Sequence, residues 1–309
     1  MIGRRIMKFK IFMLFSLSVI LLNACSDANQ SATSAPNLLP MMSPTLSITP
    51  LPTQTIYPTP TSVPSTATLF PPFTPLPKLS KDDSLARTLD LLNANSSCAL
   101  PCWWNIVPGK TNMRVAMNEL LSFVSKATMG SGNGVVVGEF LYLVPKSISS
   151  IGFIDVTLTS RSDTVDQIDV ANLNSWKYQL PSLLQTYGMP TSVWLRTYKS
   201  DYRMPQNTVP FLVALFYQEK GILAMFGETN GQVLGATIRG CIVGTAGLTL
   251  WSPAQNLNFD DVSTWKDYYD PYMTLEDASE IDVETFYERY KSGDTLPCID
   301  TPAELWPDQ

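Results

Sequence analysis

A proline-rich segment near the N-terminus sets the strongest limit on what this 309-residue chain can fold into. Residues 26–77 hold 12 of the 24 prolines and 17 Ser and Thr residues, and Asp27 is the only charged residue among them. Proline lacks the backbone N–H and fixes φ, so this segment cannot form a helix interior or a central strand. We therefore expect an extended, largely polyproline-II stalk over residues 25–78 and a globular domain over residues 79–309.

The residues before the stalk have the organisation of a bacterial export signal. Four Lys and Arg residues lie within the first ten positions and precede an apolar run over residues 11–22. Twelve residues are too few to span a bilayer comfortably, but they suit a secretory signal. Residues 22–25, Leu-Asn-Ala-Cys, resemble the lipobox of bacterial lipoproteins, whose cysteine receives a lipid and becomes the new N-terminus.

The sequence therefore predicts a signal peptide over residues 1–24 and lipidation of Cys25. Acyl chains such as palmitate on this cysteine would anchor the protein to the outer face of the cell membrane, in an extracytoplasmic location. An ordinary cleaved signal peptide followed by a chance cysteine is the alternative.

The charge balance excludes one large class of partner. The chain has a net charge of −6, and removal of residues 1–24 would leave 17 Lys and Arg residues against 27 Asp and Glu. Binding to nucleic acid needs clustered basic side chains that neutralise phosphates. An acidic exported domain does not fit that need, so we expect no nucleic-acid partner.

The four remaining cysteines predict two disulfides, because an even set in an oxidising compartment usually pairs. Three pairings are open, and we favour Cys98–Cys102 with Cys241–Cys298. The chain has no histidine. This absence excludes Ser-His-Asp and Cys-His catalytic sites and histidine-ligated metals, so no cofactor or metal is expected.

Hydrophobic periodicity predicts an α+β fold made of two helix-plus-three-stranded antiparallel meander units. The first unit covers residues 79–173 and the second covers residues 174–248. One helix is expected to start at Ser80, and a second is expected from residue 112 with Thr111 as its cap. The glycine-rich residues 130–134 are expected to break the chain. Strands are expected at residues 135–144, 151–160 and 164–173, and in the second unit at 209–218, 222–228 and 233–241, with a turn at residues 229–232.

Residues 249–309 are expected to form a C-terminal helical tail. One helix, residues 282–292, is convincing, and a disulfide between Cys298 and Cys241 would pin the tail to the second unit. The ten Asp and Glu residues at positions 260–288 match no calcium-binding loop and are expected on a solvated surface. The aromatic side chains of Trp265, Tyr268, Tyr269 and Tyr272 form a candidate binding surface, with an amphipathic edge of the tail as the alternative.

Residues 98–111, Cys-Ala-Leu-Pro-Cys-Trp-Trp-Asn-Ile-Val-Pro-Gly-Lys-Thr, resemble parts of several active sites. A phosphate-binding loop would need a glycine at the position of Trp104, and Pro108 removes an amide that would bind the phosphate. The cysteine spacing is not that of thioredoxin-like proteins. We expect a structural disulfide and buried tryptophans, with a redox role or an exposed Trp103–Trp104 platform as alternatives.

The same stretch, together with the lipobox, the stalk and an ending that contains Cys298, Thr301, Pro302 and Trp306, resembles exported lipoproteins of filamentous, Chloroflexi-type bacteria. The resemblance covers the whole chain and implies location and layout, without an activity. The repeated helix-then-meander order is more loosely similar to small outer-membrane-assembly lipoproteins and to tandem β-lactamase-inhibitor proteins. Those proteins are binding modules.

The leading functional hypothesis is a surface-anchored, non-catalytic lipoprotein that binds another protein or an envelope polymer. A glycoside or peptidoglycan hydrolase that uses two carboxylates is the first alternative, because the separation of acids in space cannot be read from sequence. A thiol-redox lipoprotein is the second.

Overall fold

The computed structural model describes residues 76–201, 203–242, 247–263, 272–294 and 296–308. The chain divides into two compact units, Met1–Ala67 and Thr68–Gln309, and every described residue belongs to the second. The predicted signal peptide, Cys25 and nearly all of the predicted stalk lie outside the described residues, as do Trp265, Tyr268 and Tyr269. Predictions for these positions stay predictions.

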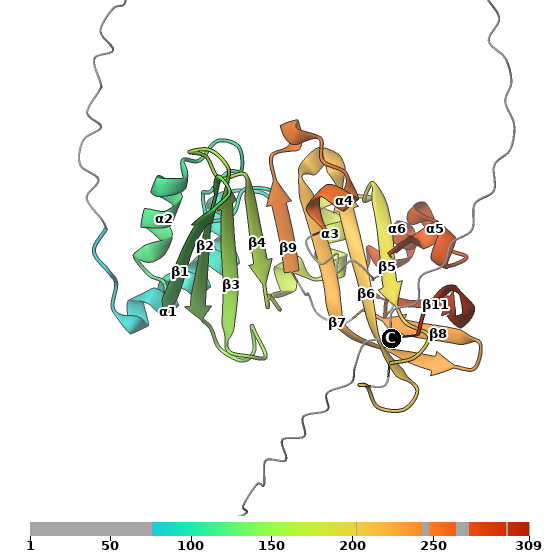
Figure 1. Cartoon of the computed structure of the whole chain (residues 1–309). Helices are drawn as coiled ribbons and strands as arrows, with labels where there is room; N and C mark the ends of the chain where they lie inside the picture. The colour runs from blue at the N-terminus through green and yellow to red at the C-terminus, as the bar shows by residue number, and fades with distance from the viewer. Residues whose placement is uncertain (1–75, 202, 243–246, 264–271, 295, 309) are drawn as a thin grey trace, which may run out of the picture. The chain divides into compact units, whose positions relative to one another are not determined.

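The first half of the described domain contains two helices followed by four strands (Figure 1). They are α1 (Lys81–Ala94), α2 (Met113–Leu121), β1 (Lys126–Gly132), β2 (Val135–Leu143), β3 (Phe153–Ser160) and β4 (Gln167–Ala171). Ser80 caps α1 as predicted, since its hydroxyl accepts from the Asp83 N–H. The cap predicted for α2 was wrong by one residue: the Asn112 side chain accepts from the backbone of the first turn.

The second half contains one helix followed by four strands. The residues after Cys241 form a last part with further short elements. The second half has α3 (Leu180–Tyr187), β5 (Ser192–Thr197), β6 (Thr208–Tyr217), β7 (Ile222–Leu234) and β8 (Thr237–Cys241). The last part has β9 (Gly247–Trp251), α4 (Phe259–Val262), β10 (Met273–Thr274), α5 (Leu275–Ala278), α6 (Val283–Tyr290) and β11 (Cys298–Pro302). The α6 helix confirms the predicted C-terminal helix, and Asp282 caps it.

The eleven strands within the described residues belong to one antiparallel sheet. The main order is β1-β2-β3-β4-β9-β7-β6-β5-β10, while β8 pairs with β7 and β11 pairs with β8. The predicted α+β class is therefore confirmed, with a larger sheet than the sequence indicated. Each half has a fourth strand that was not predicted, β1 in the first and β5 in the second.

The boundary predicted between the second unit and the tail, between residues 248 and 249, falls within β9. This strand lies between β4 and β7, where Leu250 is opposite Ile168 on one side and Ile222 on the other. All five residues of β9 are buried. A strand buried on both faces has no polar–apolar alternation, which is why periodicity did not indicate it.

Two predicted turns also differ from the structure. The glycine-rich residues 130–134 do not break the chain, because β1 runs into them and a two-residue Asn133–Gly134 turn joins it to β2. Both turn residues have positive φ, 52° and 75°, as tight hairpins require. The β7 strand continues through the predicted turn at residues 229–232, and the chain reverses at Gly235 instead.

The sheet has apolar side chains on both faces of its second half. In β6, Phe211, Val213 and Leu215 belong to the large core under α1, α2, α3 and α6. The alternate residues of β6, such as Phe216, face a smaller cluster that includes Phe259 of α4. Figure 1 shows α4 on the viewer's side of this part of the sheet, whereas nothing described lies in front of β3 and β4.

One glycine is required where the β6–β7 turn meets the end of β9. Gly221 has φ of 66°, a conformation that side chains disfavour. A Cβ atom at this position would overlap the carbonyl oxygen of Trp251. The Trp251 N–H donates to the carbonyl oxygen of Gly221 at 3.1 Å. This turn therefore packs against β9 backbone to backbone.

The predicted disulfide between Cys241 and Cys298 is present and joins β8 to β11. The two cysteines lie directly opposite each other in the strand register, with Cα atoms 3.9 Å apart. The C-terminal residues are thus attached to the sheet by the β11 strand and by a covalent bond. The sequence predicted the covalent bond.

Candidate functional site

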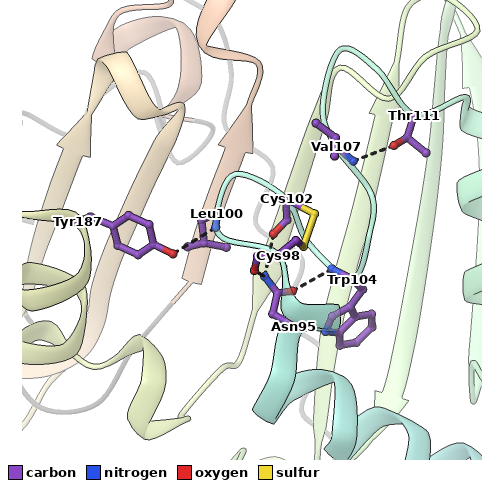
Figure 2. Close-up of a disulfide and its surroundings, with 8 residues drawn as sticks. All are labelled: Asn95, Cys98, Leu100, Cys102, Trp104, Val107, Thr111 and Tyr187. Carbon is purple, nitrogen blue, oxygen red and sulfur yellow. Dashed lines mark hydrogen bonds between the residues drawn. A yellow bond between two sulfur atoms is a disulfide. The ribbon is translucent and has the colours of Figure 1, made fainter.

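The second predicted disulfide, Cys98–Cys102, closes a small loop beside the C-terminal end of α1 (Figure 2). The buried Asn95 side chain organises this loop. Its amide donates to the carbonyl oxygens of Cys98 and Cys102, at 2.8 and 2.9 Å, and its oxygen accepts from the Trp104 N–H at 2.9 Å. One side chain thus satisfies three backbone groups that the tight loop cannot pair with each other.

The two tryptophans after the disulfide are core residues. Trp103 is fully buried and Trp104 is 5% exposed. Their rings stack with centroids 5.2 Å apart, and Trp104 meets the edge of Tyr142 at 5.1 Å. The prediction of packed tryptophans is confirmed, and the alternative of an exposed aromatic platform is wrong.

The end of the stretch is a turn without features of a phosphate site. Lys110 is exposed, as expected for a surface residue. The Thr111 hydroxyl accepts from the Val107 N–H at 2.8 Å, so it closes the turn instead of capping α2. At the other end, the Leu100 N–H donates to the Tyr187 hydroxyl, which links the loop to α3. Residues 98–111 therefore act as a structural connection between the two halves.

Of the four predicted binding-surface aromatics, only Tyr272 lies among the described residues. It is half-buried and packs edge-on against Phe259, with ring centroids 5.3 Å apart. The Arg196 guanidinium lies 5.3 Å from the centre of its ring. Trp194 stacks on Phe259 at 4.3 Å. Tyr272 thus belongs to a packed aromatic cluster over the second half of the sheet.

The first half of the sheet carries polar side chains on the corresponding face. We call this surface the open face and define it by Glu139, Asp155, Thr157, Gln167 and Asp169, on β2, β3 and β4. The register places Glu139, Thr157 and Asp169 side by side in one row across three strands. Glu139 is exposed and the other four are partly exposed. Their alternate neighbours on β3 and β4 are buried in the core.

Asp169 lies where the open face meets the aromatic cluster. Its carboxylate accepts from the Thr249 hydroxyl at 2.7 Å and from the Gln167 amide. Burial raises the pKa of Asp169, these two hydrogen bonds oppose the rise, and the nearby charge of Asp155 adds to it. Thr249 is on β9, so this strand also fixes the position of the carboxylate.

Asp155 is the least satisfied acid of the open face. Its Oδ1 atom is shielded from solvent and has no hydrogen-bond partner among the described residues. Burial raises the pKa of Asp155, and the charge of Glu139 raises it further. Three carboxylates therefore repel one another on a surface that gives them few donors, and a cationic group would relieve that repulsion.

Sequence reasoning found part of this surface. The strand predicted over residues 151–160 is confirmed, and its alternating apolar and polar residues put Asp155 and Thr157 on the outward side. The alternation could not show that Glu139 and Asp169 lie beside them, because that depends on strand register. The acids predicted on a solvated surface at positions 260–288 are exposed wherever they are described.

Comparison with family models, curated proteins and solved structures found no match to this chain. Within the described residues, no group of three or more acidic or cysteine side chains is arranged to hold a metal ion. The described helices are all too short or too polar to cross a bilayer. The resemblance to exported lipoproteins stays a prediction.

The role of Asn95 can be tested with a variant that keeps the backbone conformation. Asn95 has φ of 46°, which glycine also adopts, so Asn95→Gly removes the three hydrogen bonds without adding strain. We expect the free energy of unfolding to fall by about 2–4 kcal/mol, because buried backbone groups lose their partners. Urea denaturation measures this change.

Asn133→Gly is the matched control, since Asn133 also has positive φ but lies in an exposed turn. It should change stability by less than about 0.5 kcal/mol. Equal losses in the two variants would show that Asn95 does not organise the loop.

Proposed function

We propose that the protein is a lipid-anchored, extracytoplasmic binding protein whose folded domain is displayed on a stalk. The support for the anchor is the export signal, the lipobox-like residues 22–25 and the proline-rich residues 26–77. The two disulfides agree with an oxidising compartment. We also propose that the two halves, which have a similar element order, arose by internal duplication.

The observation that carries the binding role is the unequal covering of the sheet. In the second half, α4 and the aromatic cluster cover the face opposite the main helices. In the first half, the same face is occupied by the polar, partly exposed side chains of the open face. An antiparallel sheet is stable with one solvated face, so this surface is available to a partner without a cost in core packing.

The chemistry of the open face favours a partner with cationic groups. The charge of Glu139 raises the pKa of Asp155, and the charge of Asp155 raises the pKa of Asp169. The Oδ1 atom of Asp155 has no hydrogen-bond donor among the described residues. A Lys or Arg side chain of a protein, or an amino group of an envelope polymer, would supply charge and donors together. Such a partner would lower the raised pKa values of Asp155 and Asp169. Binding of the partner should therefore strengthen as the pH rises through these pKa values, because both carboxyls become negatively charged.

A hydrolase that uses two carboxylates is a second candidate, and one observation favours it. Asp155 and Asp169 are diagonal neighbours on adjacent strands with raised pKa values, as a general acid requires. Three hollows on the described surface lie elsewhere and include neither acid. The binding role therefore has the stronger support. A redox role for Cys98–Cys102 has less support, because Cys102 is only 9% exposed and the Asn95 side chain holds the loop in place.

The binding role is tested by adding a large cation at the centre of the open face. Thr157→Arg would pair with the acids on both sides and block a partner. With the full chain as bait in a native envelope extract, we expect recovery of the partner to fall at least about tenfold, which corresponds to about 1.4 kcal/mol. Quantitative mass spectrometry measures the recovery.

Val115→Arg adds the same charge to an exposed position on α2, which packs on the other side of the sheet. It should leave recovery unchanged. A partner that is retained equally by all three proteins, or no partner above background, would refute the binding role of the open face.

The anchor is tested separately with Cys25→Ser. Labelling of cells with radioactive palmitate should mark the wild-type protein and a Ser26→Ala control but not the Cys25→Ser variant. The variant should also leave the membrane fraction. Continued labelling of Cys25→Ser would rule out lipidation at this position.

A further inference from the structure

A groove runs along β11, on the opposite part of the sheet from the open face. It has a volume of about 530 Å³. One wall is formed by β11 with Asp300 and Pro302, and the other by the α5–α6 connection with Glu280 and Ile281. Leu305 adds apolar surface. In Figure 1, β11 and β8 lie next to α5 and α6.

The strand register shows which backbone groups of β11 point away from β8. The Ile242 N–H donates to the Pro297 carbonyl oxygen, and the Ala303 N–H donates to the Ala236 carbonyl oxygen. In an antiparallel pair the hydrogen-bonded positions alternate, so residues 299 and 301 bond to β8 and residues 298 and 300 point away from it.

The outward backbone groups of β11 are only partly used. The Cys298 carbonyl oxygen accepts from the Tyr290 hydroxyl at 2.6 Å. The Asp300 N–H has no acceptor among the described residues, and the Asp300 and Pro302 carbonyl oxygens lie on the same unpaired edge. An edge of this kind is a template for another strand. Pro302 lacks an N–H, which limits the template to a short segment.

The side chains around the groove set the charge that a bound segment would need. Asp300 is already paired with Arg239 by two hydrogen bonds of 2.7 Å. Asp277 and Glu280 add two negative charges at the groove wall, against one positive charge from Arg289. Glu280 is exposed and makes no ion pair with any described residue. The wall is therefore acidic.

We propose that this groove binds a short extended peptide segment of a partner protein, which adds to β11 as a further antiparallel strand and places a Lys or Arg side chain beside Glu280. Asp300 would exchange two backbone hydrogen bonds with the segment, and the Pro302 carbonyl oxygen would accept a third. Ile281 and Leu305 would contact its apolar side chains. Backbone pairing gives such sites affinity, and side-chain contacts give them selectivity.

The probe for this site is a fluorescein-labelled heptapeptide in which Lys alternates with Thr and Val. Fluorescence anisotropy with the full chain in detergent should show saturable binding. A control peptide with Glu in place of Lys should bind at least tenfold more weakly. Hydrogen exchange measured by NMR should show slower exchange of the Asp300 amide in the complex, with the amides of Ile299 and Thr301 unchanged because they already bond to β8.

Glu280→Lys should weaken binding of the Lys peptide at least tenfold, since it replaces attraction by repulsion. Glu284→Lys makes the same change on an exposed position of α6 outside the groove lining and should stay within twofold of wild type. The Thr157→Arg variant should also bind the Lys peptide within twofold of wild type. That result separates this site from the open face.

Three results would overturn the proposal. The first is an absence of saturation with wild type up to millimolar peptide. The second is equal binding by wild type and Glu280→Lys. The third is binding without protection of the Asp300 amide, because the peptide would then occupy another surface.

Discussion

The pairing of β9 with both β4 and β7 is the interaction on which the rest of the domain depends. Without β9, the first four strands and β5–β7 would each end in an unpaired edge. With it, one hydrogen-bonded ladder runs through both halves. The strand is only five residues long, but all five are buried, and Leu248 and Leu250 reach the main core. Burial on both faces compensates for its short length.

The same strand links the fold to the open face. Thr249 lies on the face opposite Leu248 and Leu250, and its hydroxyl holds the Asp169 carboxylate. On the other side of Thr249 in the register is Leu223, which belongs to the same hydrophobic cluster as Phe259. The boundary between the covered and uncovered parts of this face therefore follows β9. The position of the acids is a consequence of how the two halves join.

Local features of the sequence predicted much of this structure. The α6 helix, the alternation of β3 and both disulfides follow from residue spacing and compartment. The buried role of Trp103 also followed from its position after Cys102. These features depend on interactions between residues close in the chain or on covalent pairing with few choices.

The features that sequence analysis missed depend on distant pairing. The β9 strand forms because two partners from separate halves accept it, and nothing within Gly247–Trp251 indicates either partner. The β1 strand is mostly exposed and glycine-containing, so its pairing with β2 comes from the Asn133–Gly134 turn and not from burial. The acidic row of Glu139 and Asp169 requires the register of three strands. Register is a tertiary property that composition does not encode.

If β9 joins the two halves into one cooperative unit, native-state hydrogen exchange detects this cooperativity most directly. Peptides from β3 and from β6 would be followed by mass spectrometry as denaturant is raised below the unfolding midpoint. We predict that both strands reach the same opening free energy and lose protection together, with β9 among the most protected segments. Loss of protection in β9 and β3 well before β6 would contradict it, because the halves would then unfold independently.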